Sequence, residues 1–112
     1  MSASIENWLQ RAAAHRGVLA CGVRLADRTF LIRSNRQELS LARIEHAVAK
    51  LFEASQLIQQ NGIPADRLRW NFESGQILFT PRGGGALAAL FVNKDIANSE
   101  DMENLLAAFS PA

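Results

Sequence analysis

The spacing of hydrophobic positions changes several times along this chain, and the longest regular stretch lies in the middle. From Ser40 to Asn61 apolar residues recur at intervals of three and four, which is the period of an amphipathic helix. At 1.5 Å per residue such a helix would be about 33 Å long. Gly62 suits the left-handed conformation that often follows a helix, and Pro64 prevents its continuation. We therefore expect one face of this helix to lie on a sheet.

Shorter patterns flank the long helix on both sides. An apolar stripe predicts a first helix from Ile5 to His15, and Asn98 or Ser99 is expected to cap a last helix. Runs rich in β-branched and apolar residues predict five strands. These strands are Val18–Leu25, Thr29–Arg33, Arg67–Phe72, Ile77–Thr80 and Ala86–Asn93.

The order of the predicted elements is α-β-β-α-β-β-β-α, which places the chain in the α+β class. Short turns between neighbouring strands favour a five-stranded antiparallel sheet. The arrangement that buries the most puts the long helix on one face and the two terminal helices on the other. With 112 residues, we expect a single domain spanning 1–112.

The predicted strand from Arg67 to Phe72 alternates between the two faces of the sheet. Leu68, Trp70 and Phe72 share one face, and Arg67, Arg69 and Asn71 share the other. At a sheet edge, the unpaired backbone groups of this strand could pair with those of a second copy. A two-fold axis through that pairing would bring two long helices together antiparallel.

The long helix carries a second lane of residues opposite its apolar face: Ala42, His46, Ala49 and Glu53. The lane fits either a solvated helix face or a contact with the helix of a second copy. With a two-fold axis near Ala49, His46 would approach Glu53 of the partner. Such a pair would strengthen dimerisation below about pH 6.5, where histidine is protonated.

Composition and charge exclude several classes of function. Twelve basic and eleven acidic residues give a net charge of +1, so no global electrostatic attraction to nucleic acid or to an anionic membrane is expected. Arginines and aromatics of the strand Arg67–Phe72 lie on opposite faces, which disfavours an RNA-binding surface. No apolar run is long enough to span a bilayer, and the N-terminus lacks the apolar region of a signal peptide. The expected location is cytoplasmic.

Chemical motifs are few. His15 and His46 lie on different predicted helices without metal-ligand spacing, and Cys21 is expected to be a small buried residue. The run Gly83–Gly85 resembles a phosphate-binding loop only loosely, because it precedes a strand and not a helix. We interpret it as a hairpin tip. We therefore expect no catalytic residue, no metal, no cofactor and no enzymatic activity.

Beyond these patterns, the chain resembles the Roadblock family, also called the dynein light chain Roadblock-type domain. The resemblance rests on the opening helix ending at Gly17, on GVLACGVRLADRTFLIRS, on the long helix, on ESGQILFTP and on ALAALFVN before a short last helix. Gly22 and Gly75 suit glycines common in the family. Two other family glycines are absent: Asp27-Arg28-Thr29 occupies the first hairpin turn, and KDIANSED links the last strand and helix.

This resemblance implies a homodimer whose third strands pair into one continuous sheet and whose central helices pack antiparallel. Carried over to this chain, the interface comprises Arg67–Phe72 and the lane formed by Ala42, His46, Ala49 and Glu53. In bacteria and archaea such domains are often partners of small Ras-like GTPases, and the bacterial gliding-motility member is a GTPase-activating protein. Eukaryotic relatives serve in dynein and in lysosomal scaffold complexes.

Two functions follow as hypotheses. The first is a non-enzymatic homodimeric regulatory or scaffold module that binds a small Ras-like GTPase and modulates its nucleotide state or localisation. The alternative is a small-molecule-binding sensor of profilin-like or PAS-like type, since sheets flanked by helices also host ligand pockets. The predicted inward faces are filled by Leu, Ile, Val and Phe without a polar cluster, which disfavours the sensor.

Overall fold

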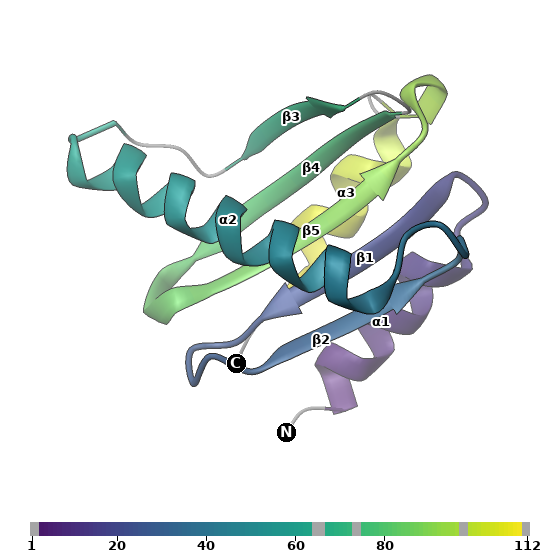
Figure 1. The fold of residues 1–112 in the computed structure, drawn as a ribbon, viewed down its shortest axis with the longest axis horizontal. Coiled ribbons are helices and arrows are strands. Elements are labelled where there is room, and N and C mark those ends of the chain that lie inside the picture. The colour runs from purple at the N-terminus through teal and green to yellow at the C-terminus, as the bar shows by residue number, and fades with distance from the viewer. Residues whose placement is uncertain (1–2, 64–66, 73–74, 97–98, 111–112) are drawn as a thin grey trace.

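Five antiparallel strands form the sheet on which the helices pack (Figure 1). The computed structural model describes residues 3–63, 67–72, 75–96 and 99–110. The strands are β1 (Val18–Arg24), β2 (Phe30–Ser34), β3 (Leu68–Phe72), β4 (Gly75–Arg82) and β5 (Ala86–Val92). Their order in the sheet is β2-β1-β5-β4-β3. The strands β2 and β3 are therefore the two edges.

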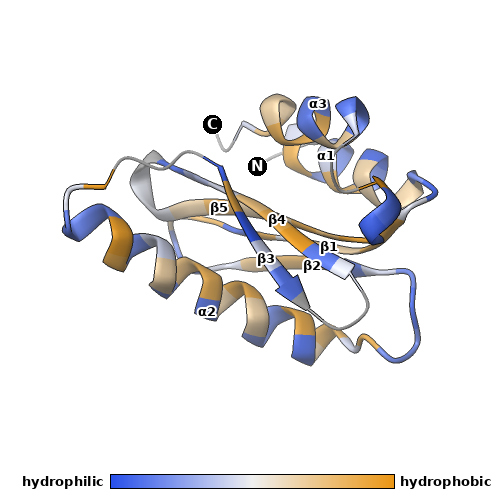
Figure 2. Ribbon diagram, turned by 90° about the horizontal axis from the view of Figure 1, so that it is seen from above, coloured by the Kyte–Doolittle hydropathy of each residue, from blue (hydrophilic) through white to orange (hydrophobic). Residues whose placement is uncertain are grey.

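Helices cover both faces of this sheet, as Figure 2 shows from above. The long helix α2 (Leu41–Gln60) lies on one face, whereas α1 (Ala3–Ala14) and α3 (Glu100–Ala108) lie on the other. Two short 3-10 turns, η1 (Gly83–Gly85) and η2 (Lys94–Ile96), flank β5. The element order, the antiparallel sheet and the three-layer arrangement predicted from the sequence are confirmed.

Alternating side chains of the central strands supply two apolar cores. Leu90 packs into the cluster beneath α1 and α3, whereas its neighbour Phe91 packs into the cluster beneath α2. Every residue of β5 is buried, as is every residue of β1 except Arg24. These two strands are therefore covered on both faces, which explains their nearly continuous apolar sequences.

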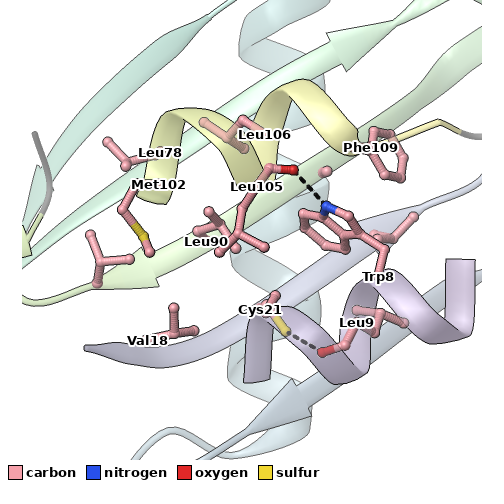
Figure 3. Close-up of a cluster of buried hydrophobic side chains, with 14 of the residues drawn as sticks. Trp8, Leu9, Val18, Cys21, Leu78, Leu90, Met102, Leu105, Leu106 and Phe109 are labelled. Carbon is pink, nitrogen blue, oxygen red and sulfur yellow. Dashed lines mark hydrogen bonds between the residues drawn. The ribbon is translucent and has the colours of Figure 1, made fainter. Parts of the chain in front are cut away.

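A buried tryptophan joins the two terminal helices (Figure 3). The indole N–H of Trp8 on α1 donates a hydrogen bond of 2.6 Å to the carbonyl oxygen of Leu105 on α3. The Trp8 ring also meets Phe109 edge to face, with ring centroids 5.3 Å apart. Trp8 thus fixes α3 against α1.

The ends of α2 follow from their capping residues. The side chain of Ser40 accepts a hydrogen bond from the backbone N–H of Arg43, which satisfies one free donor of the first turn. At the other end Gly62 has a φ of +75°, and the N–H of Ile63 bonds to the carbonyl oxygen of Ile58. This is the left-handed ending expected from the glycine. Pro64 lies outside the described residues.

A glycine in β1 lets α2 approach the sheet closely. A Cβ atom at Gly22 would lie 2.8 Å from Cδ1 of Ile32 and 3.1 Å from Cγ2 of Val48 on α2. A larger residue at this position would force Ile32 or Val48 to shift.

The strand β4 is longer than the predicted Ile77–Thr80. It begins two residues earlier, at Gly75, because the β3–β4 ladder starts with Phe72 opposite Gly75. The strand also continues through Pro81, which pairs with Leu87 of β5. On the other side of β4 the described pairs with β3 run from Gly75 to Phe79, so Pro81 lies beyond them.

Cys21 belongs to the core and is not a reactive group. Its side chain is fully buried, with the sulfur 3.8 Å from the carbonyl oxygen of Leu9 (Figure 3). Burial raises the pKa of its thiol to about 12, so the reactive thiolate is scarce at neutral pH. The prediction of a small buried residue is confirmed.

The hydrogen bond between Trp8 and Leu105 gives a first test. Trp8→Phe removes the indole N–H, leaves the buried carbonyl oxygen of Leu105 without this donor and creates a small void. The free energy of unfolding should therefore fall by about 2 kcal/mol. The matched change Trp70→Phe, at a side chain 54% exposed, should change the stability of dilute monomer by less than about 0.5 kcal/mol. Urea titration of both variants measures the difference. Equal losses would contradict the anchoring role of Trp8.

Candidate functional site

The strand β3 is an open edge of the sheet. It pairs only with β4 within the sheet, from Leu68 opposite Phe79 to Phe72 opposite Gly75. Within the described residues, no strand lies beside its outer backbone groups. Figure 2 shows β3 at the border of the sheet, with α2 on one side of it and α3 on the other.

Side chains of β3 alternate between the two faces, as the sequence predicts. Leu68 packs against the core beneath α2, and Trp70 lies on the same face. On the opposite face Arg67 forms an ion pair with Glu103 of α3. Asn71 accepts a hydrogen bond of 2.7 Å from Gln76, and Arg69 is exposed.

Trp70 leaves much of its apolar ring in solvent. It is 54% exposed, although it lies on the side of the sheet that α2 covers. With Ala47, Lys50, Leu51 and Ala54 of α2 and Ile77 of β4, it lines a hollow of about 210 Å³. We call this hollow the β3 groove. Apart from Lys50 its lining is apolar, so the groove and the edge of β3 form one uncovered surface.

A second hollow lies on the other flank of α2, and we call it the arginine hollow. Its volume is about 680 Å³, and Arg24 and Arg28 from the β1–β2 hairpin contribute its positive charge. Ala49 and Glu53 of the predicted helix lane line this hollow, not the β3 groove. The structure thus places two of the four lane residues on the flank away from β3.

The other two residues of the helix lane, Ala42 and His46, are exposed on α2. Glu53 lies 3.8 Å from Lys50 of its own helix, as an exposed pair one turn apart. The proposed contact between His46 and Glu53 of a second copy stays a prediction, because a single chain does not test it.

Arg24 is held in a fixed orientation at the wall of the arginine hollow. Its guanidinium carbon lies 3.8 Å from the centroid of the Phe52 ring, which is a cation–π contact. Its Nη1 donates to the carbonyl oxygens of Gly85 and Leu25. The side chain therefore also ties the β1–β2 hairpin to the turn between β4 and β5.

Arg28 occupies a backbone conformation that favours glycine. Its φ is +73°, and within the described residues every other positive φ belongs to a glycine. The N–H of Arg28 donates a hydrogen bond to the carbonyl oxygen of Leu25. The N–H of Leu25 donates one to the carbonyl oxygen of Thr29. This is a three-residue hairpin loop with a left-handed last residue, where glycine is usual. The arginine hollow was not predicted from the sequence. The absence of glycine from this turn was a signal for it.

The acid of the same turn is engaged locally. The carboxylate of Asp27 accepts a 3.0 Å hydrogen bond from the backbone N–H of Thr29. Hydrogen bonds from Thr29 hold the pKa of Asp27 below its usual value. Asp27 thus shapes the loop that carries Arg28.

The two histidines lie on opposite sides of the sheet. His15, just after α1, contacts Asp101 of α3 at 3.1 Å, whereas His46 is on α2. Within the described residues no group of three or more His, Cys, Asp or Glu could hold a metal ion. In the same part of the chain, no helix is both long enough and apolar enough to cross a membrane.

Comparisons with known proteins identify the fold. No family model and no curated protein matches the sequence. Among solved structures, the chain is similar to a Roadblock/LC7 domain from Streptomyces avermitilis, with a TM-score of 0.66 and 11% sequence identity. The match covers 96% of this chain and 88% of that one.

The chain therefore has the Roadblock/LC7 fold, as its sequence pattern suggested.

The backbone of Arg28 gives a second test. Arg28→Gly should raise the free energy of unfolding by about 1 kcal/mol, because glycine adopts a positive φ without the steric cost that a side chain incurs. Ala26→Gly, in the same loop but without a positive φ, should lower it by about 0.5 kcal/mol or more. Urea denaturation of the two variants gives both values. Destabilisation by Arg28→Gly would show that the side chain contributes more than its backbone costs.

Proposed function

We propose that this protein is a non-enzymatic homodimeric regulatory module that binds a small Ras-like GTPase. The observation that carries the dimer is the open edge of β3, with exposed Trp70 beside an apolar groove. Pairing of two β3 strands across a two-fold axis would satisfy both edges and cover both tryptophans. The resulting sheet would continue across the two copies.

The opposite edge of the sheet is less suited to such pairing. Within the described residues, none of the large exposed apolar side chains lies on β2. Its exposed Arg33 forms an ion pair of 2.9 Å with Glu6 of α1. A charged side chain on an edge strand discourages pairing with another chain, so β3 is the better candidate.

The position of β3 also selects the flank of α2 that would meet the partner. The groove beside Trp70 is lined by Ala47 and Ala54, whose small side chains permit close approach of a second helix. Ala49 and Glu53 lie on the other flank. We therefore assign the main helix contact to the flank of Ala47 and Ala54, and Ala49 and Glu53 would face away from it.

Binding of a GTPase rests on the likeness of fold. The Roadblock/LC7 family comprises regulatory modules and is generally non-catalytic, which favours action through a protein-binding surface. A symmetric dimer would present both α2 helices on one broad face, which suits docking of a compact protein domain. In this proposal the module modulates the nucleotide state or the localisation of the GTPase.

Small-molecule sensing is the second candidate function. The arginine hollow favours it, because two guanidinium groups and two phenylalanine rings line one concave surface. A sensor of this kind would bind its ligand outside the apolar cores.

The proposed dimer predicts which substitutions separate the copies. Wild type should be a dimer by light scattering. Trp70→Asp and Ala54→Arg should each give a folded monomer, since each places a charge in the proposed interface between the two copies. Ala49→Arg is the matched control on the other flank and should remain dimeric. Circular dichroism confirms folding of each variant. A monomeric wild type would contradict the proposed interface, and a dimer broken only by Ala49→Arg would move the contact to the other flank.

The proposed partner predicts nucleotide-dependent capture. The immobilised dimer should retain a small GTPase from a lysate of the source cells, to different extents with GDP and with a non-hydrolysable GTP analogue. Mass spectrometry identifies the GTPase, and titration of the purified pair measures affinity. The folded monomer Trp70→Asp should bind at least about tenfold more weakly if the dimer forms the surface. Absence of any GTP-binding protein in both nucleotide states would contradict the GTPase proposal while leaving the dimer intact.

A further inference from the structure

We propose that the arginine hollow is a binding site for a small phosphate ester that carries a flat ring, such as a nucleoside monophosphate. This inference goes beyond regulation by protein contacts and does not depend on the dimer or on a GTPase. The hollow measures about 680 Å³, which falls within the usual size range of small-molecule sites. It lies between the outer flank of α2, the β1–β2 hairpin and the β4–β5 turn.

Arg24 supplies a guanidinium that is already oriented. Its Nη1 donates to the carbonyl oxygens of Gly85 and Leu25, and the Phe52 ring supports its face. The Nε–H and Nη2–H donors have no acceptor among the described residues. These two groups form the parallel pair that binds two oxygens of one phosphate or carboxylate. Fixing the guanidinium before binding lowers the entropic cost of using it.

The positive charge of the hollow is not neutralised within the described part of the chain. No described carboxylate lies within the 4.0 Å ion-pair distance of Arg24 or Arg28. Glu53 lines the hollow but is paired with Lys50, and Asp27 is hydrogen-bonded to Thr29. A half-buried guanidinium without a counter-ion is costly in the free protein. A bound anion would remove that cost.

The backbone strain at Arg28 supports the same conclusion. An arginine with a φ of +73° stands where a hairpin loop of this type favours glycine. Its side chain lines the hollow opposite α2. Backbone strain of this kind clusters at functional sites, and here the strained residue adds a second positive charge to the same concave surface.

The remaining lining distinguishes a phosphate ester from inorganic phosphate. Phe30 and Phe52 are half-buried aromatic rings against which a flat ring could pack. Glu53 and Gln56 supply acceptors for hydroxyl or amino groups. A ligand with a phosphate, a polar linker and an aromatic ring would use all three kinds of group, whereas phosphate alone would use only the arginines.

Titration of the ¹⁵N-labelled protein with adenosine 5′-monophosphate tests this inference. Saturable shifts of backbone amide signals are expected in the β1–β2 hairpin, in α2 around Phe52 and Gln56, and at Gly84 and Gly85. Inorganic phosphate and adenosine should each bind at least about tenfold more weakly, because each engages part of the site. Shifts that do not saturate, or that spread over α1 and α3, would overturn the proposal. Equal affinity for adenosine would overturn the role of the arginines.

Three variants separate binding from folding. Arg28→Gly should weaken binding of the monophosphate about tenfold although it relieves backbone strain, so the loss cannot come from unfolding. Arg24→Lys keeps the charge but removes the parallel donors and should weaken binding to a similar extent. The matched control Arg11→Gln, exposed on α1 across the sheet, should leave affinity unchanged. Wild-type affinity in Arg28→Gly and Arg24→Lys would overturn the site.

Discussion

Burial of the central strands on both faces is the constraint from which the rest of the structure follows. All of β5 is buried, and most of β1. Because both faces of these strands are apolar, a helix layer is required on each side. Gly22 lets α2 seat closely against β1, and Trp8 fixes α1 and α3 to each other on the far face. The helices therefore cover the middle of the sheet best, and the edge strand β3 is left with its groove open.

The two hollows arise from this one placement of α2. The helix crosses the sheet (Figure 1), and a hollow lies along each of its two flanks. On one flank the neighbours are β3 and β4, whose side chains here are apolar, so the hollow suits another protein surface. On the other flank the neighbours are hairpin turns, which carry arginines and glycines, so the hollow suits a small anion. One helix thus separates two surfaces of different chemistry, so the proposed partner and the proposed ligand would bind on different sides of α2.

The fold could be predicted from the sequence because its signals are local. The period of α2, the alternation in β3 and the endings at Ser40 and Gly62 each depend on a few neighbouring residues. The sites were harder to predict because they depend on how α2 rotates about its axis over the sheet. Ala49 and Ala47 are two residues apart in sequence but face different hollows. Periodicity identifies opposite faces of a helix, yet it does not say which strand each flank meets.

Trp70 and Arg28 differ from the residue types that their local structure favours. Trp70 is an exposed aromatic residue where a polar one would keep the edge of β3 soluble. Arg28 occupies a left-handed position that glycine would fill without strain. The two residues lie at different hollows. When a sequence is locally consistent almost everywhere, such exceptions are expected at functional sites. In the proposed complexes a second copy would cover Trp70 and an anion would contact Arg28, so binding would offset the local cost at each position.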